Sequence, residues 1–152
     1  MNKRDFLKSA GAFVTGGMMS PLVHGEQPAP ARTNWSGNYT YTASRLYAPK
    51  SVDEVRHIVK NCGTIKALGT RHSFNGIADT GHNQVSLKNL NEMVLDANSR
   101  SVTVGAGVRY GDLAPYLQKN GFALHNLASL PHISVAGARS TATHGSGIKN
   151  GN

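Results

Sequence analysis

The chain has 152 residues, of which 39% are hydrophobic and 16% are charged, and this composition is that of one ordinary globular domain rather than a disordered segment. Its single cysteine, Cys62, excludes an internal disulfide framework and a cysteine-rich metal site. The formal net charge of +8 suits a phosphate-bearing cofactor, nucleic acid or an anionic membrane, but the basic residues are scattered and do not alternate with aromatic residues, which argues against nucleic acid.

Residues 1–32 have the pattern of an export signal followed by a proline-containing linker. A basic start precedes a weakly apolar stretch, residues 10–23, that is too short and too polar to span a membrane as a stable helix. The segment KRDFLK resembles a twin-arginine signal in which Lys3 replaces the first arginine and Arg4 is the second. We therefore expect an exported, periplasmic protein. A general secretory signal and a disordered tail are the alternatives.

Three elements are predicted in the first part of the domain, which begins at about residue 34. Alternating residues over 39–49 predict a strand. A helix is predicted over 51–63, because Ser51 and Glu54 have the spacing of a capping box and apolar residues follow at helical intervals. Residues 64–70 indicate a short strand. This β-α-β order is typical of an α+β or α/β domain.

Further strands and a second helix are predicted beyond residue 83. Strand-like runs over 84–96 and 101–108 flank residues 97–100, which have the composition of a hairpin turn. A helix is predicted over 110–121 and another short strand over 122–126.

The segment 134–147 is rich in glycine, serine and threonine. Such residues let a backbone approach a ligand closely, and their N–H and hydroxyl groups can hold phosphate oxygens. A flexible surface loop is the alternative, and composition alone does not separate the two. The usual glycine motifs of nucleotide-binding loops are absent from the sequence.

Several ordinary catalytic chemistries find no support in the sequence. The seven histidines show no metal-binding spacing, and we expect no metal site. Ser146 lies between two glycines, but in the wrong frame for a hydrolase nucleophile. Cys62 is expected to be a small buried residue on the face of the first helix.

Three linked blocks nevertheless resemble a known family. They are ALGTRHSFN at 67–75, GAGVRYGDLAPYL at 105–117 and NLASLPHISVAGARSTATHGSG at 126–147. Together they resemble the FAD-binding (PCMH-type) domain of the vanillyl-alcohol-oxidase flavoproteins, most closely its alditol (xylitol, sorbitol) oxidase branch and next the sugar-1,4-lactone oxidases. The resemblance covers residues 34–152. It implies an α+β (α/β-like) domain of two small α/β subdomains, incomplete at its C-terminus.

The resemblance also implies site residues for FAD. His72 would carry the flavin covalently, through a bond from an imidazole nitrogen to the flavin 8α-methyl carbon. Ser129 would also face the substrate. Arg71 stands where many members of the family have a second glycine. The full implied cofactor-binding set is Ala67, Leu68, Gly69, Thr70, Arg71, His72, Ser73, Ser129, Ser134, Gly137, Thr141, Ala142, Thr143 and His144.

The function implied by the resemblance is that of an exported FAD-dependent oxidase acting on the CH–OH groups of sugar alcohols, with oxygen or another electron acceptor. A D-arabinono- or L-gulono-1,4-lactone oxidase is one alternative, and a truncated flavin-binding module without catalysis is another. Enzymes of the family continue well past the last residue of this chain. We therefore expect the groups that bind substrate and take its hydroxyl proton beyond Asn152, and no catalytic residue before it. The sequence leaves the oligomeric state open.

Overall fold

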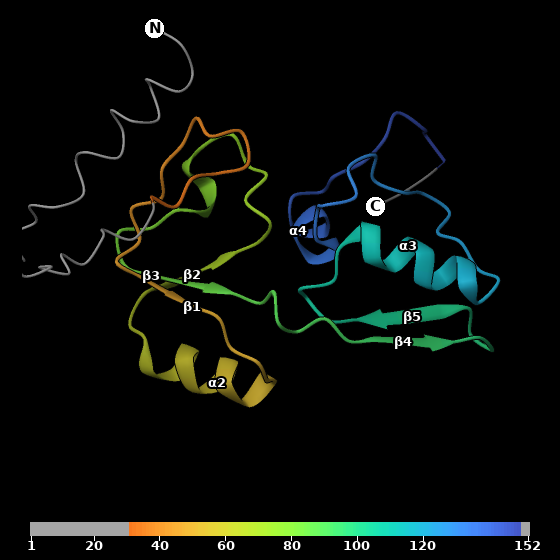
Figure 1. Cartoon of the computed structure of the whole chain (residues 1–152), viewed down its shortest axis with the longest axis horizontal. Helices are drawn as coiled ribbons and strands as arrows, with labels where there is room; N and C mark the ends of the chain where they lie inside the picture. Colours follow the sequence, from red (N-terminus) through yellow and green to blue (C-terminus); the bar gives the residue numbers. More distant parts are fainter. Residues whose placement is uncertain (1–30, 150–152) are drawn as a thin grey trace, which may run out of the picture. The chain divides into compact units, whose positions relative to one another are not determined.

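The computed structural model describes residues 31–149 (Figure 1). The predicted export signal therefore lies outside the described residues, apart from Ala31 and Arg32 of its linker. The described chain is a mixed α/β structure with two small sheets, which confirms the predicted fold class.

The first sheet is parallel and contains β1 (Arg45–Tyr47), β2 (Ile65–Leu68) and β3 (Asn83–Ser86) in the order β1-β3-β2. The helix α2 (Val52–Asn61) connects β1 to β2, and the short 3-10 helix η2 (Gly76–Ala78) precedes β3. The predicted β-α-β order is therefore present. Leu68 and Val85 are buried apolar residues of this sheet, and β2 ends at Leu68, directly before the turn that presents His72.

The strand predicted over 39–49 forms only at β1. At Thr42, ahead of β1, the backbone bonds to a side chain instead of to a neighbouring strand. The Asp79 carboxylate accepts from the Thr42 backbone N–H at 2.9–3.0 Å and from the Thr42 hydroxyl at 2.8 Å. A backbone N–H that is held by a side chain cannot also join a strand ladder. The prediction was therefore wrong for residues 39–44, although Tyr41 and Ala43 are buried as a half-buried strand would require.

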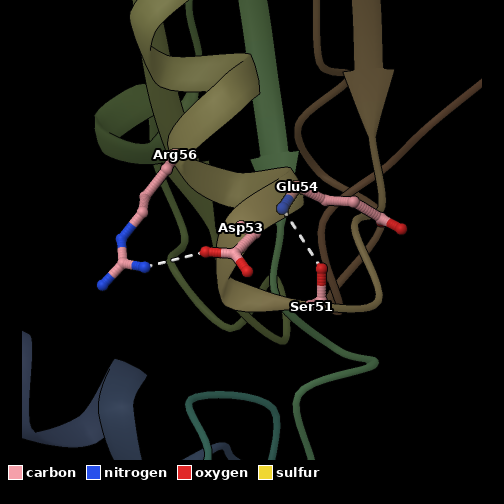
Figure 2. A network of polar contacts seen from close by, with 4 residues as sticks. All are labelled: Ser51, Asp53, Glu54 and Arg56. Atoms are coloured by element: carbon pink, nitrogen blue, oxygen red, sulfur yellow. Dashed lines mark hydrogen bonds and ion pairs between the residues drawn. The ribbon is translucent and has the colours of Figure 1, made fainter.

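The helix α2 begins where the capping residues predict (Figure 2). Ser51 Oγ accepts from the Glu54 backbone N–H at 3.2 Å, and the Glu54 carboxylate accepts from the Lys50 N–H at 2.7 Å. Arg56 and Asp53 form an exposed ion pair at 2.8 Å, one turn apart. The bond to Ser51 satisfies one of the backbone N–H groups of the first turn, which have no partner within the helix.

The C-terminal end of α2 differs from the prediction in one respect. Cys62 is half-buried and lies at the C-cap, where its backbone N–H donates to Ile58 O at 2.9 Å. It is therefore not a buried residue of the helix face. No residue of α2 is fully buried, and Val52 and Val59 are half exposed.

The second sheet is the antiparallel hairpin of β4 (Met93–Asp96) and β5 (Ser101–Val104). Its turn lies at residues 97–100, as predicted, and Asp96 stabilises it by accepting from the Asn98 N–H and the Ser99 hydroxyl. The run 84–96 is not one strand, because β3 and β4 belong to different sheets and residues 87–92 connect them.

The helix α3 (Tyr110–Lys119) confirms the second predicted helix and packs on the hairpin (Figure 1). Its Leu113 and Leu117, with Val108, form a buried cluster against partly buried residues of β4 and β5. This packing is the main hydrophobic core of the described chain.

The later part of the chain departs from one prediction and decides one open alternative. Residues 122–126 form no strand: the Phe122 N–H donates to Leu117 O at 2.9 Å and closes the end of α3, while Phe122 and Leu124 pack on the core as irregular chain. The small-residue segment 134–147 is not loop throughout, because it contains the helix α4 (Val135–Ser140), capped by Ser134 Oγ at the Gly137 N–H.

Candidate functional site

All three of the sequence blocks contribute to one cleft of about 1670 Å³. Its lining includes the whole of 67–75, four residues of the second block (among them Gly107 and Arg109) and most of the third block from His132 to Thr143. Pockets for drug-sized ligands usually measure about 300–1,000 Å³, so this cleft has room for a larger ligand of dinucleotide size.

The turn after β2 lies against the start of α4. The Ser134 backbone N–H faces Thr70 Oγ1 at 3.3 Å. A Cβ atom built on Gly69 would meet Ser134 Oγ at 3.6 Å and Gly137 Cα at 4.0 Å. The residues predicted from two blocks far apart in sequence therefore meet in space, and small side chains keep the backbone accessible there.

His72 lies in an aromatic cluster within the cleft. Its Nδ1 is 3.4 Å from His132 Nε2, and its ring centroid is 4.8 Å from that of Trp35 and 5.7 Å from that of Phe74. The Trp35 ring also stacks on His132, with centroids 5.4 Å apart and an interplanar angle of 13°. A histidine with these neighbours has a defined orientation, in contrast to a solvated loop histidine.

The backbone around His72 is held by residues 33–38. The Trp35 N–H donates to Arg71 O at 2.8 Å, and the amide of Asn34, a residue only 3% exposed, donates to Ser73 O at 2.9 Å. Arg71 has a left-handed backbone (φ +64°), and its guanidinium donates to Thr33 O at 2.9 Å. An arginine in this conformation carries some strain, which is offset by these contacts.

The charges along the cleft favour an anionic ligand. Four of its lining residues are cationic and one, Asp112, is anionic. Within a cleft, cations attract and orient phosphate groups. The cations are Arg32, Arg71, Lys88 and Arg109. The room, the small residues and the positive charge therefore fit a dinucleotide that carries a pyrophosphate, such as FAD.

The predicted site residues divide into two groups by position. Eleven of them line the cleft: the seven of 67–73, and Ser134, Gly137, Thr141 and Thr143. Three do not. Ser129 and Ala142 are exposed, and His144 is exposed with its Nδ1 at 2.9 Å from the neighbouring Gly145 O. The role of each residue toward FAD stays a prediction.

Sequence reasoning missed Trp35, Arg109 and His132 as residues of the cleft. His132 lies within the third block, 126–147, and its imidazole could have been predicted as a site residue. Arg109 likewise stood inside the second block. Trp35 had no signal, because nothing in a single sequence shows that residue 35 returns to residues 72 and 132.

Between residues 31 and 149, no three His, Cys, Asp or Glu side chains are grouped so as to hold a metal ion. In the same part of the chain, no helix has the length and apolar character needed to cross a bilayer.

Comparisons with known proteins agree with this geometry. The family model described as FAD binding domain matches residues 43–151. The alditol oxidase of Streptomyces sp. is 47% identical over 126 residues, which are 80% of this chain and 30% of that enzyme. The L-gulonolactone oxidase of Mus musculus is 33% identical over 135 residues, covering 86% of this chain and 30% of that enzyme.

A solved structure also resembles the fold. The cholesterol oxidase of B. sterolicum superimposes with a TM-score of 0.60 at 21% identity, over 76% of this chain and 24% of that one. The chain thus spans less than a third of the length of these relatives. Since the family model covers most of the chain and its blocks converge on one cleft, the chain belongs to the FAD-binding domain family.

Proposed function

We propose that the chain is the FAD-binding portion of an oxidase that acts on the CH–OH groups of sugar alcohols, and that it carries FAD covalently at His72. Similarity to an alditol oxidase supports the substrate class. The observation that carries the proposal is the position of His72 in a cleft formed by the family's blocks, with a fixed imidazole and a positively charged lining.

Each part of the cleft has a role in this proposal. The imidazole of His72 bonds to the flavin 8α-methyl carbon. The small residues Gly69, Ser134 and Gly137 of the cleft lining would let the flavin approach the backbone, and the cleft cations would neutralise the pyrophosphate. Bound FAD supplies the acceptor for a hydride from the substrate and passes the electrons to oxygen or another acceptor.

Ser129 facing the substrate remains a prediction from the sequence. Its side chain is exposed and lies outside the cleft lining. Export to the periplasm is likewise proposed from the sequence of residues 1–32, in which Lys3 and Arg4 stand for the twin arginines. Replacing both by alanine should leave the protein in the cytoplasmic fraction, and unchanged periplasmic recovery would contradict a twin-arginine route.

The attachment of FAD is tested by mass. The protein is produced with FAD, denatured and weighed intact. The wild type should gain the mass of one FAD less two hydrogens, and His72→Ala should gain nothing. His57→Ala, an exposed histidine of α2 outside the cleft, is the matched control and should keep the added mass. An equal gain in His72→Ala would place the bond elsewhere, and no gain in the wild type would reject covalent attachment.

The similarity to an L-gulonolactone oxidase supports a second candidate, an oxidase of sugar lactones. The two candidates differ in the substrate from which the purified yellow protein should form peroxide. A response to xylitol or sorbitol alone supports the proposal, and a response to a sugar-1,4-lactone alone supports the second candidate. Peroxide from either substrate would exclude a flavin-binding module without catalysis.

A further inference from the structure

Trp35 is connected to the His72 turn in two separate ways. Its backbone N–H donates to Arg71 O at 2.8 Å, immediately before His72. Its indole ring contacts both imidazoles of the cleft, His132 by parallel stacking and His72 at a tilt of 49°. Among the aromatic side chains between residues 31 and 149, Trp35 is the one whose ring contacts both imidazoles, since the ring of Phe74 contacts His72 alone.

Burial does not explain the position of this side chain. Trp35 is 56% exposed, whereas aromatic residues that serve the core are buried. Its ring instead faces the cleft, where it forms a wall beside the two imidazoles. The ring contacts of the indole are with His72 and His132, so holding these two imidazoles is the main consequence of its placement.

The backbone of this segment is fixed without the indole. The Asn34 amide donates to Ser73 O and to Asn38 Oδ1, and its Oδ1 accepts from the Tyr39 N–H at 3.1 Å. The Arg71 guanidinium adds the bond to Thr33 O. Removing the indole should therefore leave the turn in place while it frees the two imidazole rings to rotate.

We propose that Trp35 is a positioning residue for flavin attachment, holding the imidazoles of His72 and His132 in one arrangement within the cleft. The proposal rests on the proposed attachment of FAD at His72. In that step a C–N bond replaces one C–H bond of the 8α-methyl carbon and one imidazole N–H bond. The two electrons and two protons released pass to the flavin itself and then to dioxygen, which becomes hydrogen peroxide.

The first test compares rates of covalent FAD incorporation into apo-protein, followed by flavin fluorescence of the denatured protein. Trp35→Ala should slow incorporation by about tenfold to a hundredfold, the range expected when a reacting group loses its orientation. Trp35→Phe keeps an aromatic ring and should restore most of the rate. Val52→Ala, which trims a comparably exposed apolar side chain of α2 outside the cleft, should match the wild type.

The result that overturns the proposal is a Trp35→Ala rate equal to that of the wild type. An equal slowing in Trp35→Phe would also overturn it, because ring stacking would then not be the cause. Incorporation that is absent in the wild type and in His72→Ala alike would instead be a failure of the proposed function.

A second measurement needs no flavin. In nitrogen-15-labelled apo-protein, the ring signals of His72 and His132 should show one tautomer each and large ring-current shifts. Trp35→Ala should reduce the shifts, leaving at His72 the share that comes from Phe74, and should average the His72 tautomers, while the dispersed backbone spectrum shows that the fold is retained. Unchanged imidazole signals in a folded Trp35→Ala variant would contradict the positioning role, whether or not FAD is attached.

Discussion

Replacing Asp79 by asparagine should destabilise the protein in a way that depends on pH. The Asp79 carboxylate is 8% exposed and accepts from the Thr42 N–H, the Thr42 hydroxyl and the Tyr39 hydroxyl. Its burial raises the pKa, but these donors and the Thr80 N–H lower it more, and the net result is a pKa of about 2 against an ordinary 3.8. The native state therefore favours the charged form.

The magnitude follows from linkage between protonation and folding. A pKa lowered from 3.8 to about 2 corresponds to about 2.4 kcal/mol of stability at neutral pH. Partial contact with water reduces the effect, so Asp79→Asn should cost about 1–2 kcal/mol at pH 7, in the range of hydrogen bonds to charged groups. Because the folded pKa is the lower one, this contribution is present above pH 4 and is lost as the pH falls toward 2.

Urea unfolding of the wild type and of Asp79→Asn at pH 7 and pH 3 measures this difference directly. The gap between the two free energies of unfolding should shrink to about half at pH 3. Taking the difference between the two proteins cancels the contribution of other carboxylates, including Asp96, whose pKa is lowered by bonds from Ser99 and Asn98. An equal gap at both pH values would refute the reasoning, since the loss would then come from packing rather than from charge.

Two further substitutions test local features of the fold. Gly105→Ala should cost about 1–3 kcal/mol of stability, because the new Cβ would lie 2.2 Å from Leu90 O, while Gly63→Ala, which enters open space, should cost far less in the same unfolding assay. Ser51→Ala should cost about 1 kcal/mol through loss of the bond from the Glu54 N–H, and an unchanged denaturant midpoint would show that this cap contributes nothing.

The parts of the fold that could be predicted from sequence are those fixed by bonds between residues close together in the chain. The start of α2 follows from Ser51 and Glu54, and the β4–β5 turn lies where the polar residues after Asp96 indicated. In both cases the decisive bonds join residues two to four positions apart.

Predictions failed where distant residues decide the conformation. Asp79 takes the Thr42 N–H across 37 positions and so ends a strand that the alternating pattern alone would extend. The chain also leaves one sheet and enters another between β3 and β4, which a continuous apolar run does not reveal.

In the candidate site, too, the locally determined features could be predicted and the contacts between distant residues could not. The glycine-led turn and the small residues of 134–147 were visible in the sequence, and most of them line the cleft. The contact between His72 and His132 spans 60 positions, and the stacking of Trp35 on His132 spans even more. These pairs depend on how the chain returns on itself, so no periodicity or spacing rule could find them.

Arg71 has a consequence for the order in which the chain folds. Its left-handed backbone is disfavoured locally, and its bond to Thr33 O spans 38 positions. The turn that presents His72 is therefore not encoded by the turn residues alone. It requires the segment around Thr33, which the ribosome makes earlier and which is already available when residues 71–74 emerge. Truncation just before Asn38 should thus disturb a loop more than thirty residues downstream while sparing the β4–β5 hairpin, which is built from neighbours.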